Sequence, residues 1–227
     1  MASGEWKIYV VNEVHDWIDS LDDTTHTRIV QAIDTLAEVG PGLGRPLADT
    51  IHGSSIANLK ELRPGTVRIL FAFDPWRDSI LLVAGEKAGR WKDWYHQAIP
   101  LAEQRYERYV PQGAGTGGGT TNMSSYVAWS DIRAEHVARA GGEETVEAGK
   151  RQMLAEVVGH RLAEIRRARG LTQQQVADRM GVSKGRISQI ERGKISGQDV
   201  LARYATALGG HLHQAIYFDD GDITAIA

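Results

Sequence analysis

A glycine-rich tract near the middle of the chain constrains its fold more than any other feature. Residues 113 to 122 read GAGTGGGTTN and contain no large apolar side chain. Such a tract cannot bury enough surface to offset the entropy lost on ordering, so it predicts a flexible linker between two parts, residues 1–112 and 123–227. Met123 follows at once, as the start of a separate polypeptide would. The fusion is natural or engineered, and a glycine tract directly before an internal Met points toward engineering.

The composition limits the chemistry that either part can perform. The 227 residues suffice for two domains of roughly 100 residues each. The chain has no cysteine, which excludes disulfides, thiolate metal sites and a cysteine nucleophile and fits a reducing cytoplasm. No apolar run reaches the ~18 residues that span a bilayer, so we expect a soluble, cytoplasmic protein. We expect no metal and no other cofactor.

The two parts differ in charge. Residues 1–112 contain 12 basic and 16 acidic side chains, a net charge of −4. Residues 151–194 contain 10 basic and 4 acidic side chains, a net charge of +6. The basic segment favours a nucleic-acid partner for the second part.

The first part has the pattern of an α+β domain. Its apolar periodicity predicts a strand at 7–11, helices at 14–21 and 25–39, strands at 59–63, 67–73 and 80–87, and a last helix at 100–109. The three later strands are separated by short turns, so we expect a small antiparallel sheet with helices.

The second part is predicted to be almost wholly helical, with a possible terminal strand. Its helices are expected at 143–169, 173–180, 183–192 and 198–208, followed by a strand at 211–218. An acidic tail formed by Asp219, Asp220 and Asp222 follows that strand.

Residues 171–193 carry the pattern of a helix-turn-helix. Thr172 and Gln175 form a capping box, Ser183 can cap the second helix, and Gly181 allows the turn. The apolar positions share one buried side: Val176, Ala177, Met180, Val182, Ile187 and Ile190. The segment resembles the XRE-type family of lambdoid phage repressors and Cro.

That resemblance implies which side chains bind DNA. Those at base edges in the major groove would be Lys184, Gly185, Ser188 and Gln189. Those near phosphates would be Gln173, Arg186 and Arg192. Relatives bind pseudo-palindromes as dimers, so we also expect a homodimer formed through this half.

Cations lie on the predicted strands of the first part. Strand alternation suggests that Lys60 and Arg68 share a face, with Glu61 on the other. Such a basic sheet is suited to binding phosphate. The four histidines of this part are scattered along the sequence, and we expect surface or partly buried positions rather than ligand roles for His15, His26, His52 and His96.

Several strings of the first part resemble the phage Gp49-like branch of the RelE/HigB toxins: GPGLGRP at 40–46, NLKELR at 58–63, RILFAFDP at 68–75 and GEK at 85–87. The resemblance implies a ribosome-dependent, metal-independent endoribonuclease that cuts mRNA. RNA cleavage needs a base, stabilisation of charge on the phosphate and an acid. We assign Lys60 as base, Arg63 and Arg68 as phosphate clamp, and Lys87 as acid or second clamp; Tyr95 or Trp91 would stack a base.

HigB-like toxins pair with XRE-type, HigA-like antitoxins, so the two resemblances support each other. They imply a type II toxin–antitoxin module whose halves bind each other and whose complex represses its own operon. Residues 123–150 or the tail 209–227 would contact the toxin, and inhibition would either block the active site or keep the toxin out of the ribosome. Two alternatives stay open: a transcription regulator with an inactive RelE-like domain, and a ParE-type toxin directed at gyrase.

Overall fold

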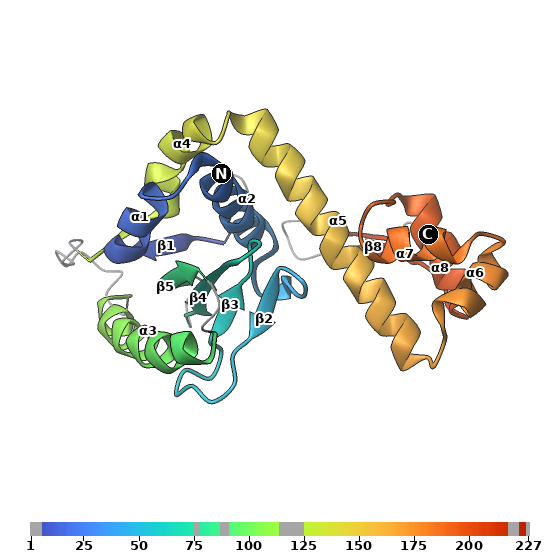
Figure 1. Ribbon diagram of the computed structural model, residues 1–227, viewed down its shortest axis with the longest axis horizontal. Coiled ribbons are helices and arrows are strands. Elements are labelled where there is room, and N and C mark those ends of the chain that lie inside the picture. Colours follow the sequence, from blue (N-terminus) through green and yellow to red (C-terminus); the bar gives the residue numbers. More distant parts are fainter. Residues whose placement is uncertain (1–5, 75–77, 87–90, 114–124, 218–222, 226–227) are drawn as a thin grey trace. The chain divides into compact units, whose positions relative to one another are not determined.

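The computed structural model describes residues 6–74, 78–86, 91–113, 125–217 and 223–225 (Figure 1). The chain forms two compact units, which divide between Arg151 and Gln152. The division falls after the glycine-rich tract because residues 126–151 belong to the same unit as the first half of the chain. Within the described ranges, no helix combines the length and the apolar character needed to cross a membrane.

The first unit is built on a six-stranded mixed sheet with the strand order β2-β3-β4-β5-β1-β6. The strands are β1 (Ile8–Val11), β2 (Ala48–Thr50), β3 (Lys60–Leu62), β4 (Val67–Phe73), β5 (Ser79–Glu86) and β6 (Tyr126–Ala128). Strands β3, β4 and β5 form the predicted antiparallel arrangement, and β2 adds to β3 as an antiparallel strand that was not predicted. Strand β1 runs parallel to β5, so the sheet is mixed rather than wholly antiparallel, because these two strands are far apart in sequence and need no hairpin.

Helices cover both faces of this sheet, with α3 on one side and α1 and α2 on the other (Figure 1). They are α1 (Asn12–Asp19), α2 (Asp23–Val39), α3 (Trp91–Gly113) and α4 (Trp129–Arg139). The Asp22 carboxylate caps α2 by accepting from the amides of Thr24 and Thr25, both at 3.0 Å. Helix α3 starts nine residues before the predicted start at Pro100, because the helix continues through the proline despite the lost amide donor.

The core of the first unit lies on both faces of β4, where Ile69, Leu70, Phe71 and Ala72 are all fully buried. Helix α2 is capped at its C-terminal end by Gly40, which has a φ of +61°, a value that glycine adopts without strain. A Cβ there would stand 2.1 Å from the Trp6 ring, so glycine is also required for the close packing of that indole.

The second unit contains the predicted helix-turn-helix. Helix α5 (Glu143–Ala168) continues into this unit and is followed by α6 (Gln173–Met180), α7 (Lys184–Glu191) and α8 (Gln198–Ala207). The capping box of Thr172 and Gln175, the Ser183 cap and the left-handed Gly181 are all confirmed. The predicted core is also confirmed, although Val182 is only partly buried.

The end of the chain forms a small hairpin of β7 (Ala215–Tyr217) and β8 (Ile223–Ala225). The predicted single strand at 211–218 is therefore shorter than expected and has a partner within the chain. The acidic residues Asp219, Asp220 and Asp222 lie outside the described residues.

Candidate functional site

A buried carboxylate organises the cationic cluster of the sheet. Glu61 is 1% exposed, and its Oε1 accepts from Arg63 Nε at 2.7 Å. Its Oε2 accepts from the Tyr95 hydroxyl at 2.5 Å and lies 3.6 Å from Arg68 Nε. Arg63 also contacts Asp49 at 2.8 Å. Two guanidinium groups, one phenol and one carboxylate therefore meet on the face that α3 covers, and we call Glu61, Arg63, Arg68 and Tyr95 the Glu61 cluster.

The register of β3 and β4 places Lys60 on the opposite face. Lys60 pairs with Phe71 and Glu61 with Leu70, so Glu61 shares a face with Arg68. The predictions that Lys60 and Arg68 share a face and that Glu61 faces away were therefore wrong. Sequence alternation fixes which residues of one strand share a face, but it does not fix the register between two strands.

Lys60 has its own surroundings. Its Nζ donates to the Pro41 carbonyl at 3.0 Å and lies 5.9 Å from the centre of the Phe73 ring. Burial lowers the pKa of the Lys60 ammonium, and Asp49 opposes this effect. This lysine is thus easier to deprotonate than an exposed one, but it is not part of the Glu61 cluster.

Two donors of the Glu61 cluster are suited to holding an anion. Arg68 Nε is buried and has no hydrogen-bond partner among the described residues, while Arg68 Nη1 donates to the carbonyls of Gly65 and Val67. Burial and the hydrogen bond to Glu61 raise the pKa of Tyr95, so the phenol keeps its proton at neutral pH. A phosphate placed here would meet guanidinium donors, and the Tyr95 hydroxyl once that hydroxyl leaves Glu61.

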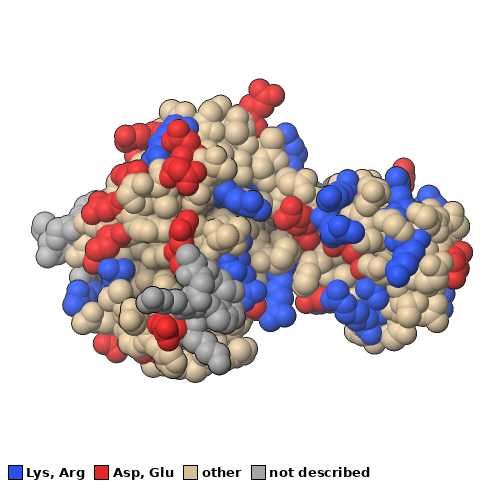
Figure 2. Space-filling view, in the orientation of Figure 1, with Lys and Arg blue, Asp and Glu red and all other residues tan. Residues whose placement is uncertain are grey.

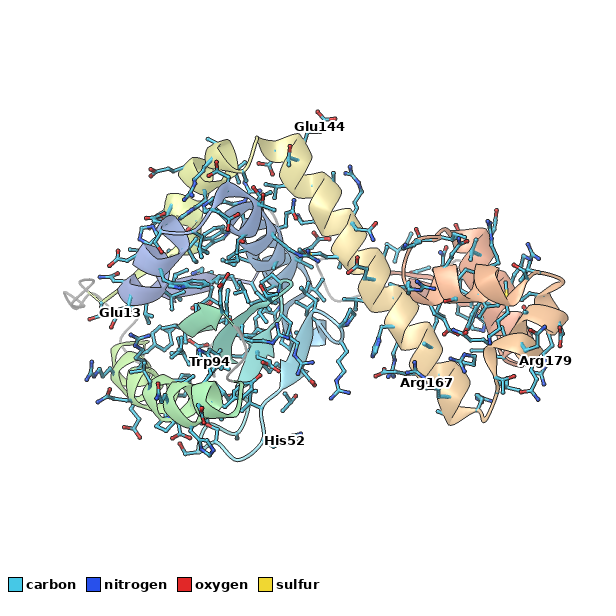
Figure 3. The ribbon with its side chains drawn as sticks, viewed as in Figure 1. Glu13, His52, Trp94, Glu144, Arg167 and Arg179 are labelled. Carbon is cyan, nitrogen blue, oxygen red and sulfur yellow. The ribbon has the colours of Figure 1, made fainter. Side chains whose placement is uncertain are left out.

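Helix α3 closes over the cluster through Trp94, which points from the helix toward the sheet (Figure 3). Trp94 packs so closely on Gly85 that a Cβ there would stand 2.5 Å from the indole Nε1. Lys87 lies outside the described residues, and the side chain of Trp91 is not described. Their predicted roles therefore stay predictions.

The start of the second half of the chain docks on the first half. Strand β6 adds to the sheet beside β1, and α4 packs on α2. Within this interface the buried Asp34 accepts from Trp129 Nε1 at 2.7 Å and from two nitrogens of Arg133 at 2.7 and 2.9 Å. Lys150 Nζ adds an ion pair with Glu38 at 3.0 Å. We call residues 126–151 the docking segment.

Strand β6 of the docking segment lies far from the Glu61 cluster and does not cover it. Strand β6 is four positions from β3 in the sheet, which corresponds to about 19 Å at the usual spacing of strands. The segment before the helix-turn-helix, which the sequence offered for contact with the first half, therefore makes such a contact through residues 126–150.

The predicted DNA contacts of the second unit lie mostly at its surface. The exposed ones are Lys184, Gly185, Arg186, Gln189 and Arg192, while Gln173 and Ser188 are half-buried. Gln173 Nε2 donates to Glu191 at 2.8 Å, and Arg192 Nη2 donates to Ser188 Oγ at 2.5 Å. Groups of Lys and Arg side chains lie on this unit in Figure 2.

Beneath that surface, a buried ion pair holds the helices together. Arg166 binds both carboxylate oxygens of Glu191, at 2.6 and 3.0 Å, and the Tyr204 hydroxyl donates to the same carboxylate at 2.6 Å. Because Arg166 is committed to this contact, it supports the fold of the unit rather than a DNA phosphate.

Comparison with known proteins matches each half separately. Residues 16–107 match the phage-derived Gp49-like family, and residues 162–214 match a helix-turn-helix family. The candidate toxin HigB3 of Mycobacterium tuberculosis is 44% identical over 112 residues, 48% of this chain and 98% of that protein. The candidate antitoxin HigA3 of the same organism is 39% identical over 103 residues, 44% of this chain and 94% of that protein. The chain belongs to the HigB–HigA toxin–antitoxin family.

Both HigB and HigA relatives thus align with one chain, which has a fused toxin–antitoxin architecture. The candidate toxin HigB2 of the same organism is 47% identical over 107 residues, 45% of this chain, and this chain spans only 53% of its length. The predicted family and the predicted α+β and helix-turn-helix folds are confirmed.

Proposed function

We propose that the HigB-like half is an endoribonuclease that cuts mRNA on the ribosome and is neutralised by the HigA-like half. The observation that carries this proposal is the Glu61 cluster, which offers donors to a phosphate on a sheet of a HigB-type domain. The alternatives of an inactive RelE-like domain and of a gyrase-directed toxin have no comparable support in the geometry.

The cluster suggests how its residues divide the chemistry. Arg63 and Arg68 hold the phosphate and stabilise the charge that develops as the 2′-oxygen attacks it. Tyr95, which keeps its proton, would break its hydrogen bond to Glu61 and give that proton to the departing 5′-oxygen. Glu61 is a positioning residue that orients both arginines. Lys60 lies on the other face, so we do not retain it as the base; the base is outside this set.

We propose that neutralisation does not depend on covering the cluster with β6. The docking segment is held at the far edge of the sheet, about 19 Å from β3 by strand spacing. The bulk of the attached antitoxin half would then keep the toxin out of the ribosomal decoding site.

The HigA-like half is proposed to bind operator DNA and to repress its own operon. Lys184 and Gln189 would contact base edges, with Gly185 and Ser188 close to the same bases, and Gln173, Arg186 and Arg192 would contact phosphates. Gln173 must leave Glu191 to do so. An apolar groove of about 450 Å³, lined in part by Val158, Ile165 and Leu201, supports a homodimer through this half.

Growth of a bacterial host tests the toxin half. Residues 1–112 expressed alone should arrest growth, and the full chain should not. Arg68→Ala should relieve the arrest, while an Arg108→Ala change at an exposed position of α3 should leave it intact. Normal growth with a soluble, folded first half would contradict the proposal.

A further inference from the structure

Four side chains that are widely spaced in the sequence meet where α1, α2 and α4 come together. His15 and Asp19 lie one turn apart on α1, His26 lies on α2, and His136 lies on α4 of the docking segment. His26 and His136 are 0% and 3% exposed. Nothing in the sequence predicts this cluster, because His136 lies 110 positions from His26 and joins the toxin-half residues only when the docking segment packs on them.

The distances fit a small metal ion. One ligand atom from each of His15, Asp19 and His136 lies within 4.8 Å of the other two. His15 Nε2 is 3.6 Å from Asp19 Oδ2, and His136 Nδ1 is 3.9 Å from Asp19 Oδ1. Tetrahedral Zn²⁺ places nitrogen and oxygen ligands about 3.4 Å apart, so the ligands must close by only small movements.

The two side chains that must move to bind a metal, those of His15 and Asp19, are partly exposed and can rotate. His15 and Asp19 side chains are 25% and 54% exposed, so their rotation disturbs no core. The His136 ring is held in place between His26 and Trp129, with ring centres 5.1 Å away on each side. Trp129 is in turn fixed by its hydrogen bond to Asp34. One ligand is thus preorganised, and two adjust to it.

Charged groups surround the two buried imidazoles. Burial lowers the pKa of His26 to about 4 and lowers the pKa of His136. Arg139 is a nearby positive charge, but its guanidinium is engaged by Asp23 and the carbonyls of Asp19 and Leu21. The carboxylates of Asp19, Asp23 and Glu135 also act on the two imidazoles.

Only one of the two ring nitrogens of His26 has a hydrogen-bond partner among the described residues. Its Nε2 is 2.9 Å from His136 Nδ1, but its buried Nδ1 has no hydrogen-bond partner in the described part of the chain. A metal bound to His136 Nδ1 would replace this hydrogen bond, and His26 Nε2, 2.9 Å from that nitrogen, would then lie beside the ion.

From this juxtaposition we propose that His15, Asp19 and His136, with His26 beside them, form a Zn²⁺ site that ties the docking segment to the toxin domain. The site uses two residues of the toxin half and one of the antitoxin half, so bound metal strengthens their association. It does not depend on what the toxin cleaves.

Zinc binding to the full chain tests the site. After treatment with a chelator and its removal, Zn²⁺ titration by calorimetry should give one bound ion per chain. His15→Ala and Asp19→Ala should each weaken binding at least about tenfold, since even residues that only support a ligand contribute that much. The matched control is His160→Ala, because His160 and Glu164 form a similar pair one turn apart, 3.5 Å from each other, with no third ligand beside them in the described ranges.

Hydrogen exchange of the same samples tests the bridging. Zn²⁺ should slow amide exchange in α4 of the parent chain and of His160→Ala, but not of His15→Ala, while exchange in α6 and α7 stays unchanged. Metal-free His15→Ala should melt like the metal-free parent, which shows that the variant is folded. Absence of stoichiometric Zn²⁺ binding, or binding that both α1 variants retain, would overturn the proposal.

Discussion

Replacing Asp34 by alanine should release the docking segment from the toxin domain. This carboxylate is 5% exposed and accepts three hydrogen bonds, one from Trp129 and two from Arg133. Without it, the indole donor loses its partner in a buried setting. Among the described residues, Glu143 is then the charged partner that the guanidinium keeps.

The size of the effect follows from the burial of these groups. Breaking a buried ion pair by removing one partner costs about 3–5 kcal/mol. The Arg133 side chain is 32% exposed, so part of its charge is recovered by water. We therefore take the lower end, about 3 kcal/mol, which corresponds to roughly 100-fold in the equilibrium between docked and released segment.

Hydrogen exchange of the full chain measures this equilibrium. In Asp34→Ala, the amides of α4 should exchange roughly 100-fold faster than in the parent, as expected from the free energy above. The amides of β4 should be unchanged, which shows that the toxin core is intact. Asp16→Asn, at an exposed position of α1, is the control. Acceleration of less than about threefold in α4 would refute the role given to Asp34.

Three further predictions concern the two units separately. In the growth assay, Arg68→Ala should abolish arrest and Lys60→Ala should retain it, because only Arg68 belongs to the Glu61 cluster; the reverse result would restore the lysine as base. Burial raises the pKa of Glu191, but hydrogen bonds, with that from Arg166 the largest, outweigh burial and lower it. The ionised carboxylate therefore stabilises the second unit at pH values above its unfolded pKa of about 4.3, and this stabilisation is lost as the pH falls through the lower folded pKa. Thermal melts of the parent should show this acid loss and those of Glu191→Gln should not; equal acid sensitivity would contradict it. Gly193→Ala should destabilise the second unit by about 2 kcal/mol or more, because Gly193 has a φ of +69° and a Cβ there would lie 2.5 Å from the backbone of α5. An unchanged melting temperature would show that the contact between Gly193 and α5 does not require glycine.

The sequence predicted the second unit well because its signals are local. The Thr172 and Ser183 caps, the turn at Gly181 and the apolar spacing each act within a few residues. Both ends of α6, α7 and α8 accordingly lie within one residue of the ends predicted from the sequence. A prediction based on helical periodicity succeeds where one element determines its own ends.

The first unit was harder to predict because its site depends on pairing between distant segments. The register that puts Glu61 opposite Leu70 moves Lys60 to the other face, and nothing within β3 alone encodes it. Strand β6 has three residues and gains its pairing from β1, more than a hundred residues earlier. The contact of His136 with His26 likewise spans 110 positions.

Mapping of RNA ends in cells tests the central claim most directly. Primer extension should reveal new mRNA 5′ ends within coding regions when residues 1–112 are expressed, and these ends should be absent with Arg68→Ala and with the full chain. Growth arrest by residues 1–112 without any new mRNA ends would contradict an RNA-cleaving toxin and would favour a target such as gyrase.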